Sequence, residues 1–335
     1  MLSEARAFHT ACLILWGLLV AASPTSAQVN ATGTEPFSVV AHVARAREIA
    51  GPDAASFGVD LLCLPTSGFL EGYRALRNSS GSDRVYVGRA FENIYYIGFA
   101  GVGTWLITTS DGLILIDALN TPSEAETILV PSIRSLGLNP ADLRYVVVTH
   151  GHGDHFGGAR YLQDTFGSRV VLAGPDWELT EGRSPEARAR LVAPARDVVA
   201  EDGQEITVGE TTVRILHTPG HTAGTISMII PGRWGGETHY LTLAGGSGML
   251  DPELTATYHD SFHKLWEAGI AVGADGVLST HGWMHGAIEK LQTMTRVEPG
   301  GPNPFLLGAE SYGRFMRAQD HCVMANLMRH SLEGR

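Results

Sequence analysis

The stretch VVVTHGHGDHFGG, Val146–Gly158, places four side chains that can bind metal within six residues, shortly after three valines. These side chains are His150, His152, Asp154 and His155. The valines predict a buried strand, and polar groups at the carboxyl end of such a strand are typical of α/β sites. In an extended backbone, His150 and His152 point to the same side, because a single residue separates them. The intervening glycines allow a bend that directs the other two elsewhere.

This density of imidazole predicts a metal site with two ions. Four ligand side chains so close in sequence cannot easily all reach one tetrahedral ion, so two neighbouring ions sharing the segment fit better. Imidazole and carboxylate without thiolate suit zinc, with iron or manganese as weaker alternatives. A patch of surface histidines is the alternative interpretation.

Two later segments supply the ligands that each ion still lacks. LHTPGHTAGT, Leu216–Thr225, places His217 and His221 after one predicted strand, and VLSTHGWMHG, Val277–Gly286, places His281 after another. We expect His221 to complete the first ion and His281 the second. His217 is a candidate to support a ligand from behind. The remaining histidines of this half are expected on the surface or on helices: His239, His259, His263 and His285.

The coarse pattern predicts an α/β fold built as a sandwich of two mixed sheets with external helices. With 335 residues, 44% of them hydrophobic, the chain can bury a substantial core. A strand meander with Asp111-Gly112 as a hairpin turn precedes helices that alternate with strands, and the second half repeats this theme. Two such halves predict sheets packed face to face. The helix predicted over Ser123–Gly137 is interrupted at Pro131.

The first residues predict an export signal. Ala11–Ala22 is an apolar run of twelve residues, too short for a bilayer that needs about 20. Small residues predict cleavage after Ala27, with an uncleaved anchor as the alternative. We therefore expect a signal peptide over 1–27, an N-terminal extension over 28–83 that is a candidate lid or interface, and a catalytic domain over 84–335. The mature protein is expected to be periplasmic or secreted, with no membrane attachment.

Charge and cysteines limit the partners and the compartment. The net charge of −11 disfavours a nucleic-acid partner, and we expect a small-molecule substrate. After cleavage, Cys63 and Cys322 remain as an even pair in an oxidising compartment. A bridge between them and two unrelated buried thiols both remain open.

The motifs THGHGDH, HTPGHTAGT and STHGWMHG, in this order, resemble the metallo-β-lactamase fold superfamily from about Asn93 to Arg329. The resemblance implies an αββα sandwich that binds two zinc ions per chain. The first zinc would be held by His150, His152 and His221. The second would be held by Asp154, His155 and His281.

One departure points to a subclass. Related thioesterases and lactonases carry a bridging aspartate where this chain has Gly245 and Gly246, and a cysteine typical of another lactamase subclass is also missing. The chain therefore resembles the third subclass of zinc β-lactamases, as does NPFLLGAESYGRFM, Asn303–Met316. Ser247 is the remaining candidate for contacting substrate. We expect Gly246→Asp, or Gly245→Asp if the register differs by one residue, to add an anionic ligand between the ions, to tighten metal binding and to abolish lactam hydrolysis.

These features predict an exported dinuclear zinc hydrolase that opens β-lactam antibiotics and so contributes to antibiotic resistance. Asp154 would be the catalytic residue that orients the nucleophile. Asp117 is a candidate to orient a ligand, with a plain turn residue at a strand end as the alternative. The alternative is a hydrolase of the same fold that acts on a lactone, ester, thioester or phosphoester. A non-catalytic zinc protein is a third possibility.

Overall fold

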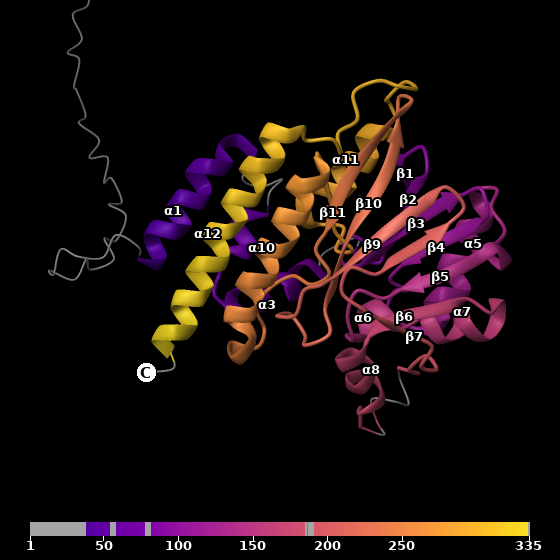
Figure 1. Ribbon diagram of the computed structural model, residues 1–335, viewed down its shortest axis with the longest axis horizontal. Coiled ribbons are helices and arrows are strands. Elements are labelled where there is room, and N and C mark those ends of the chain that lie inside the picture. Colours follow the sequence, from indigo (N-terminus) through magenta and orange to yellow (C-terminus); the bar gives the residue numbers. More distant parts are fainter. Residues whose placement is uncertain (1–37, 54–57, 78–81, 185, 187–190, 334–335) are drawn as a thin grey trace, which may run out of the picture. The chain divides into compact units, whose positions relative to one another are not determined.

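Two mixed β-sheets pack face to face in the computed structural model, which describes residues 38–53, 58–77, 82–184, 186 and 191–333 (Figure 1). The described residues fall in one compact unit, Phe37–Arg335. The predicted signal peptide over 1–27 and the start of the extension lie outside the described residues. The predicted αββα arrangement is confirmed.

The first sheet has seven strands in sequential order. They are β1 (Tyr86–Phe91), β2 (Ile94–Gly98), β3 (Gly103–Thr109), β4 (Gly112–Ile116), β5 (Leu143–Val147), β6 (Arg169–Ala173) and β7 (Val198–Ala200). β1 to β4 form an antiparallel meander, and β4 to β7 run parallel. Parallel strands bring their carboxyl ends to one edge, which places the end of β5 beside the end of β4.

The second sheet has five strands in the order β12-β11-β10-β9-β8. They are β8 (Glu205–Val208), β9 (Thr211–His217), β10 (Ile226–Trp234), β11 (Glu237–Leu243) and β12 (Gly276–Leu278). All pairs are antiparallel except β11 with β12.

Alternation along the strands sorts the apolar side chains into an inner and an outer layer. In β3, Trp105 and Ile107 pack between the sheets, whereas Leu106 packs against helices. The same alternation holds in β4 for Ile114 and Leu115. The sheets therefore share one buried core, and each is covered on its other face.

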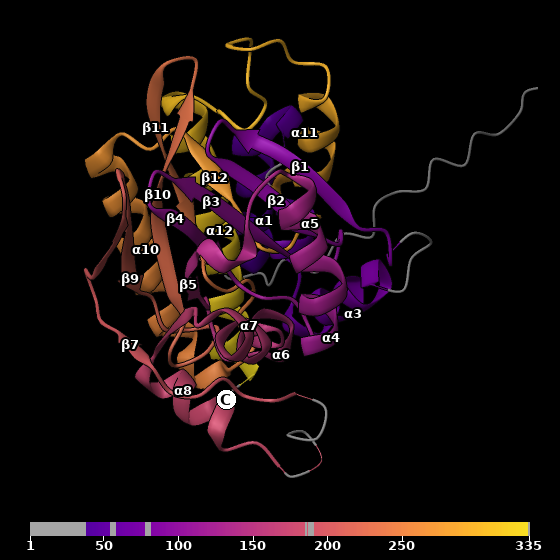
Figure 2. The same cartoon turned by 90° about the vertical axis from the view of Figure 1, so that its right-hand side faces the viewer.

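The helices form the two outer layers. They are α1 (Val39–Ala50), α2 (Val59–Leu62), α3 (Thr66–Arg77), α4 (Pro122–Glu124), α5 (Val130–Ser135), α6 (Gly153–Phe156), α7 (Ala159–Phe166), α8 (Gly174–Glu181), α10 (Thr255–Val272), α11 (Ala287–Met294) and α12 (Ala309–Glu333). α5, α7 and α8 cover the first sheet, and α10 covers the second. Figures 1 and 2 show α1 beside α12, which it packs against. No helix in the described part of the chain is both long and apolar enough to cross a membrane.

Two local predictions are refined by the structure. The β3–β4 hairpin turns at Ser110-Asp111, and Gly112 already pairs with Thr109. The helix predicted to break at Pro131 instead widens before it, because Ala125–Leu129 form a π-helical turn that leads into α5. A wide turn accommodates the proline without ending the helix.

A disulfide joins the two ends of the described chain. Cys63 follows α2, and Cys322 lies in α12, and their sulfurs are bonded. This resolves the two readings of the cysteines in favour of the bridge. It fixes the helical N-terminal segment against the C-terminal helix.

Candidate metal centre

The six predicted ligands converge at the carboxyl ends of the strands from both sheets. His150 and His152 follow β5, and Asp154 and His155 lie in α6. His221 sits in the loop between β9 and β10, and His281 follows β12. Their ligand atoms form two groups, each within 4.8 Å: His150 with His152 and His221, and Asp154 with His155 and His281.

Backbone carbonyls fix the imidazoles of the first group. His150 Nδ1 lies 2.8 Å from Gly245 O, and His221 Nδ1 lies 2.8 Å from Gly248 O. Each Nδ1 therefore donates its proton to a carbonyl and leaves Nε2 with a lone pair. Both Nε2 atoms point at His152 Nδ1, at 3.0 and 3.1 Å. One nitrogen can donate to only one of these two lone pairs, whereas a cation between the three satisfies all of them.

Burial keeps this group neutral and ready to bind metal. It lowers the pKa of His221 to about 3 and the pKa of His150 well below its ordinary value, with neighbouring histidines adding to both shifts. Burial also lowers the pKa of His152. Metal ligation requires neutral imidazole, so the residues of this group fit a zinc ion.

The second group combines a carboxylate with two fixed imidazoles. His155 Nδ1 lies 2.6 Å from Asp117 Oδ2, and His281 Nδ1 lies 2.7 Å from Gly101 O, so both Nε2 atoms are turned away from these acceptors. Asp154 Oδ2 is 3.7 Å from His155 Nε2. Two imidazoles with one carboxylate suit a zinc ion that keeps a position open for water or substrate.

Neighbouring opposite charges shift the pKa values of Asp154 and His155 in the second group. Burial alone would raise the pKa of Asp154, but His155, His281 and the Tyr73 hydroxyl outweigh it and lower this pKa. Burial alone would lower the pKa of His155, but Asp117 and Asp154 raise it. Burial and the charge of His155 lower the pKa of His281 to about 4. Asp154 is therefore ionised, as a metal ligand must be.

Asp117 lies where the sequence predicts a supporting residue. It follows β4, is fully buried and has φ = 62°. Besides His155, it accepts hydrogen bonds from Thr149 N at 2.7 Å and Thr149 Oγ1 at 2.9 Å. It therefore positions both the His155 ring and the backbone that leads to His150.

Asp176, which sequence reasoning missed, joins two ligand loops. Its carboxylate accepts hydrogen bonds from Gly151 N at 2.6 Å, Thr222 Oγ1 at 2.6 Å and Gly224 N at 2.9 Å. Gly151 separates two ligands, and Thr222 follows a third. Asp176 lies in the first turn of α8, and its sequence context carries no signal of this role.

Tyr73, also missed, comes from α3 in the N-terminal extension. Its hydroxyl donates to Asp154 Oδ2 at 2.9 Å, and the edge of its ring meets His281 with centroids 5.3 Å apart. Trp283 stacks on the same imidazole at 5.9 Å. The extension therefore contributes directly to the centre, as a lid would.

Close packing explains the glycines after β11. A Cβ on Gly245 would lie 1.8 Å from Ile226 O, and a Cβ on Gly246 would lie 2.4 Å from His221 Cβ. Neither position has room for a side chain. The expectation that Gly246→Asp adds a ligand and tightens metal binding is therefore wrong, since the new side chain would displace His221.

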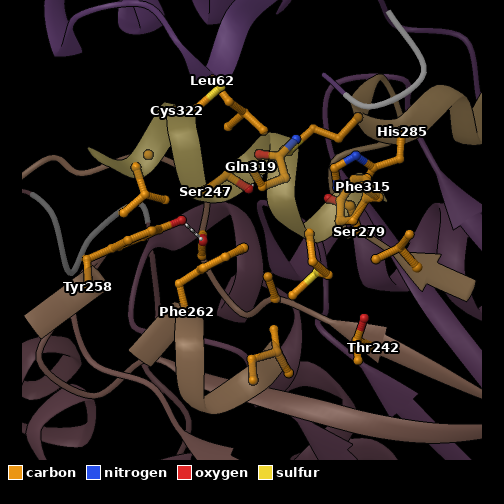
Figure 3. Close-up of a pocket in the computed structure, with 18 of the residues that line it drawn as sticks. Leu62, Thr242, Ser247, Tyr258, Phe262, Ser279, His285, Phe315, Gln319 and Cys322 are labelled. Carbon is orange, nitrogen blue, oxygen red and sulfur yellow. Dashed lines mark hydrogen bonds between the residues drawn. The ribbon is translucent and has the colours of Figure 1, made fainter. Parts of the chain in front are cut away.

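Ser247 lies behind this glycine segment rather than over the ligands. It lines a largely apolar cavity with Tyr258, Phe262 and Phe315, which contains none of the six ligands among its described residues (Figure 3). Its hydroxyl donates to Met284 Sδ at 3.0 Å. The predicted substrate contact of Ser247 is not supported by this position.

His217 is also placed differently from its predicted supporting role. Its ring lies 3.1 Å from Ala223 O, and its backbone N–H donates to Asp202. Among its described interactions, none reaches the six ligands. It closes the loop that carries His221 instead.

The αββα fold and the two ligand groups define a metallohydrolase-type scaffold, and comparison with known proteins finds a family that part of the chain resembles. Residues 97–233 match the family model described as the metallo-beta-lactamase superfamily. This match agrees with the superfamily that the motifs predict.

Solved structures narrow the resemblance to a subclass. The fold is similar to BJP-1, a subclass B3 metallo-β-lactamase of Bradyrhizobium japonicum, with a TM-score of 0.63 and 25% identity, over 77% of this chain and 100% of that one. It is also similar to the FEZ-1 metallo-β-lactamase from Legionella gormanii, with a TM-score of 0.62 and 19% identity, over 73% of this chain and 96% of that one, which supports the fold alone.

Curated relatives carry a different name. A hydroxyacylglutathione hydrolase of Pseudomonas aeruginosa (strain LESB58) is 34% identical over 124 residues, which are 36% of this chain and 41% of the relative. One of Gloeothece citriformis (strain PCC 7424) is 30% identical over 155 residues, 45% of this chain and 54% of the relative. The chain thus matches about half or less of these relatives' length.

Proposed function

We propose that the protein is an exported dinuclear zinc hydrolase that opens the amide bond of β-lactams. One ion would be held by the imidazoles of residues 150, 152 and 221, and the other by Asp154, His155 and His281. Two zinc ions supply a hydroxide nucleophile near neutral pH and stabilise the charge that develops on the opened amide. The substrate would be a small molecule, and no nucleic-acid partner is proposed.

The protein's own residues prepare this chemistry. The carbonyls of Gly245, Gly248 and Gly101 hold three imidazoles with Nε2 forward. Asp154, kept ionised, would help hold the second ion, orient the nucleophile and accept its proton. Tyr73 and Trp283 pack against the His281 ring of the second group and so hold it in place.

Gly245 and Gly246, which follow β11, bear on which class of substrate the protein hydrolyses. A carboxylate between the ions is typical of the related thioesterases and lactonases, and neither Gly245 nor Gly246 leaves space for one. The similarity to a subclass B3 metallo-β-lactamase over that enzyme's full length supports the same choice.

A second candidate is a thioesterase on the same scaffold. It is favoured by the curated relatives, which are named hydroxyacylglutathione hydrolases and share about a third of their residues with the matched region. Lactones, other esters and phosphoesters have no comparable support.

Parallel assays separate the two candidates. Purified, zinc-loaded protein is given a chromogenic cephalosporin or a hydroxyacyl thioester of glutathione, with and without chelator. We expect chelator-sensitive cephalosporin turnover that His152→Ala abolishes. The control is His239→Ala, which removes a histidine paired with Asp275 outside the centre. Turnover of the thioester alone would replace the first proposal by the second.

Export is a further part of the proposal. The signal-like residues 1–27 motivate it, and the Cys63–Cys322 bridge supports it, because such bridges persist in oxidising compartments. We expect periplasmic extracts to contain a chain that begins near Gln28, as measured by N-terminal sequencing. A full-length cytosolic product would exclude export.

A further inference from the structure

A separate cluster of ligand side chains lies where α10 packs against α12 (Figure 1). His259 and His263 are four residues apart on α10, so one face of the helix presents both imidazoles. Asp320 meets them from α12. The three side chains are 26%, 37% and 24% exposed, so a dissolved ion can reach them. None of them contributes to the centre described above.

Both imidazoles converge on one carboxylate oxygen. Asp320 Oδ1 lies 2.9 Å from His263 Nε2 and 3.5 Å from His259 Nε2, and the ring centroids are 4.6 Å apart. One ligand atom from each residue falls within 4.8 Å of the others. Ligands of a tetrahedral zinc with bonds of about 2.0–2.1 Å stand roughly 3.3 Å apart. The distances from Asp320 Oδ1 to the two Nε2 atoms, 2.9 Å and 3.5 Å, lie on either side of this ligand spacing.

The donor types select the ion. Without metal, Asp320 Oδ1 accepts the Nε2–H of His263, while the second imidazole approaches the same oxygen at a longer distance. With metal, both imidazoles offer Nε2 lone pairs and the carboxylate offers one oxygen, which leaves a position for water. Two imidazoles and a carboxylate suit zinc and its transition-metal neighbours rather than calcium or magnesium.

Contacts on both sides hold the ligands in place before any ion arrives. Cys322, two residues after Asp320, is bonded to Cys63. Tyr258, next to His259, donates its hydroxyl to Gly246 O at 3.2 Å (Figure 3). Because both helices are fixed at this point, little backbone freedom is lost when an ion binds.

We propose that His259, His263 and Asp320 form an additional zinc site that joins α10 to α12. It binds one divalent transition-metal ion independently of the catalytic centre, and its role is to lock the two helices together. This site goes beyond the proposed hydrolase function and does not depend on it.

Metal counting tests the site directly. Wild type, His259→Ala and His263→Ala are dialysed to equilibrium against the same free Zn²⁺, and bound zinc is measured by mass spectrometry. We expect each variant to bind one ion fewer per chain than wild type, whatever the occupancy of the main centre. His239→Ala, which removes a histidine paired with a single aspartate, should match wild type. Equal zinc in wild type and in both α10 variants would overturn the proposal.

A stability measurement separates binding from folding damage. In chelator, His263→Ala should melt close to wild type, since it loses only a partly exposed hydrogen bond. In excess Zn²⁺, wild type should gain more in melting temperature than His263→Ala. Equal gains would show that the His263–Asp320 pair is only a hydrogen bond between helices. Asp154→Ala should lose its own ion yet keep the α10–α12 ion, which distinguishes this site from the hydrolase centre.

Discussion

Asp176 holds two ligand loops together, so its loss should loosen the first metal group without removing a ligand. Asp176→Ala leaves buried donors on Gly151 and Gly224 without an acceptor, each costing about 1–3 kcal/mol. We expect zinc affinity to fall about 10- to 100-fold, as measured by chelator competition. The zinc affinity of Asp176→Asn should lie between those of wild type and Asp176→Ala, because asparagine keeps a carbonyl acceptor. Asp164→Ala, which breaks an exposed pair with Arg160, should change little.

The hydrogen bond from the Tyr73 hydroxyl to Asp154 can be tested by removing one oxygen atom. Tyr73→Phe keeps the ring against His281 but removes the hydroxyl that donates to Asp154. We expect the second ion to dissociate about 10-fold more easily, because an outer hydrogen bond to a ligand is lost. Zinc retention during dialysis measures this. Tyr240→Phe on an exposed strand position is the control, and equal retention in both variants would contradict the role of Tyr73.

Gly246 tests the close packing behind His221. In Gly246→Ala, the new Cβ would lie 2.4 Å from His221 Cβ. We expect a loss of metal from the first group and of hydrolysis, rather than tighter binding. Gly174→Ala is the matched control, since its Cβ would meet only Val199 Cγ1 at 3.8 Å. Wild-type zinc content in Gly246→Ala would show that the segment can move.

At the scale of elements, the disulfide connects α2 with α12 across 259 residues of sequence. The double variant Cys63→Ser/Cys322→Ser should lower the free energy of unfolding by about 2–5 kcal/mol, as measured by denaturant titration. Reductant should lower wild type to a similar value and leave the double variant unchanged. A wild type that is insensitive to reductant would contradict this contribution.

The same scale explains which features the sequence predicts. The strands and the six ligands are predictable because alternation and strand-end motifs are local, and because parallel strands must bring their ends together. Tyr73 and Asp176 act only when segments far apart in sequence meet, which no local pattern records. The expectation that Gly246→Asp tightens metal binding is wrong, because a sequence does not show how much space surrounds a glycine. Ser247 and His217 are polar residues near the motifs, but their side chains point elsewhere.

For the whole molecule, metal and stability should be coupled. In the first group two unprotonated Nε2 atoms face His152 Nδ1, which can donate to only one of them, so the metal-free state leaves one lone pair unsatisfied and zinc relieves this. Zinc at 100 times its dissociation constant should add about 2.7 kcal/mol to the free energy of unfolding. Calorimetry of His263→Ala, which isolates the main centre, should show a rise in melting temperature with Zn²⁺ but not with Mg²⁺. An unchanged melting temperature would argue against metal at this centre.

The packing of α1 on α12 also limits the order in which the chain can fold during synthesis. α1 is made early, yet the surface it covers does not exist until α12 has been synthesised. Folding that proceeds along the nascent chain can therefore assemble both sheets before α1 docks on α12. The Cys63–Cys322 bond also has to wait for α12, because Cys322 lies in that helix. A protein that crosses a membrane unfolded would complete both steps only after translocation, where its crosslink can form.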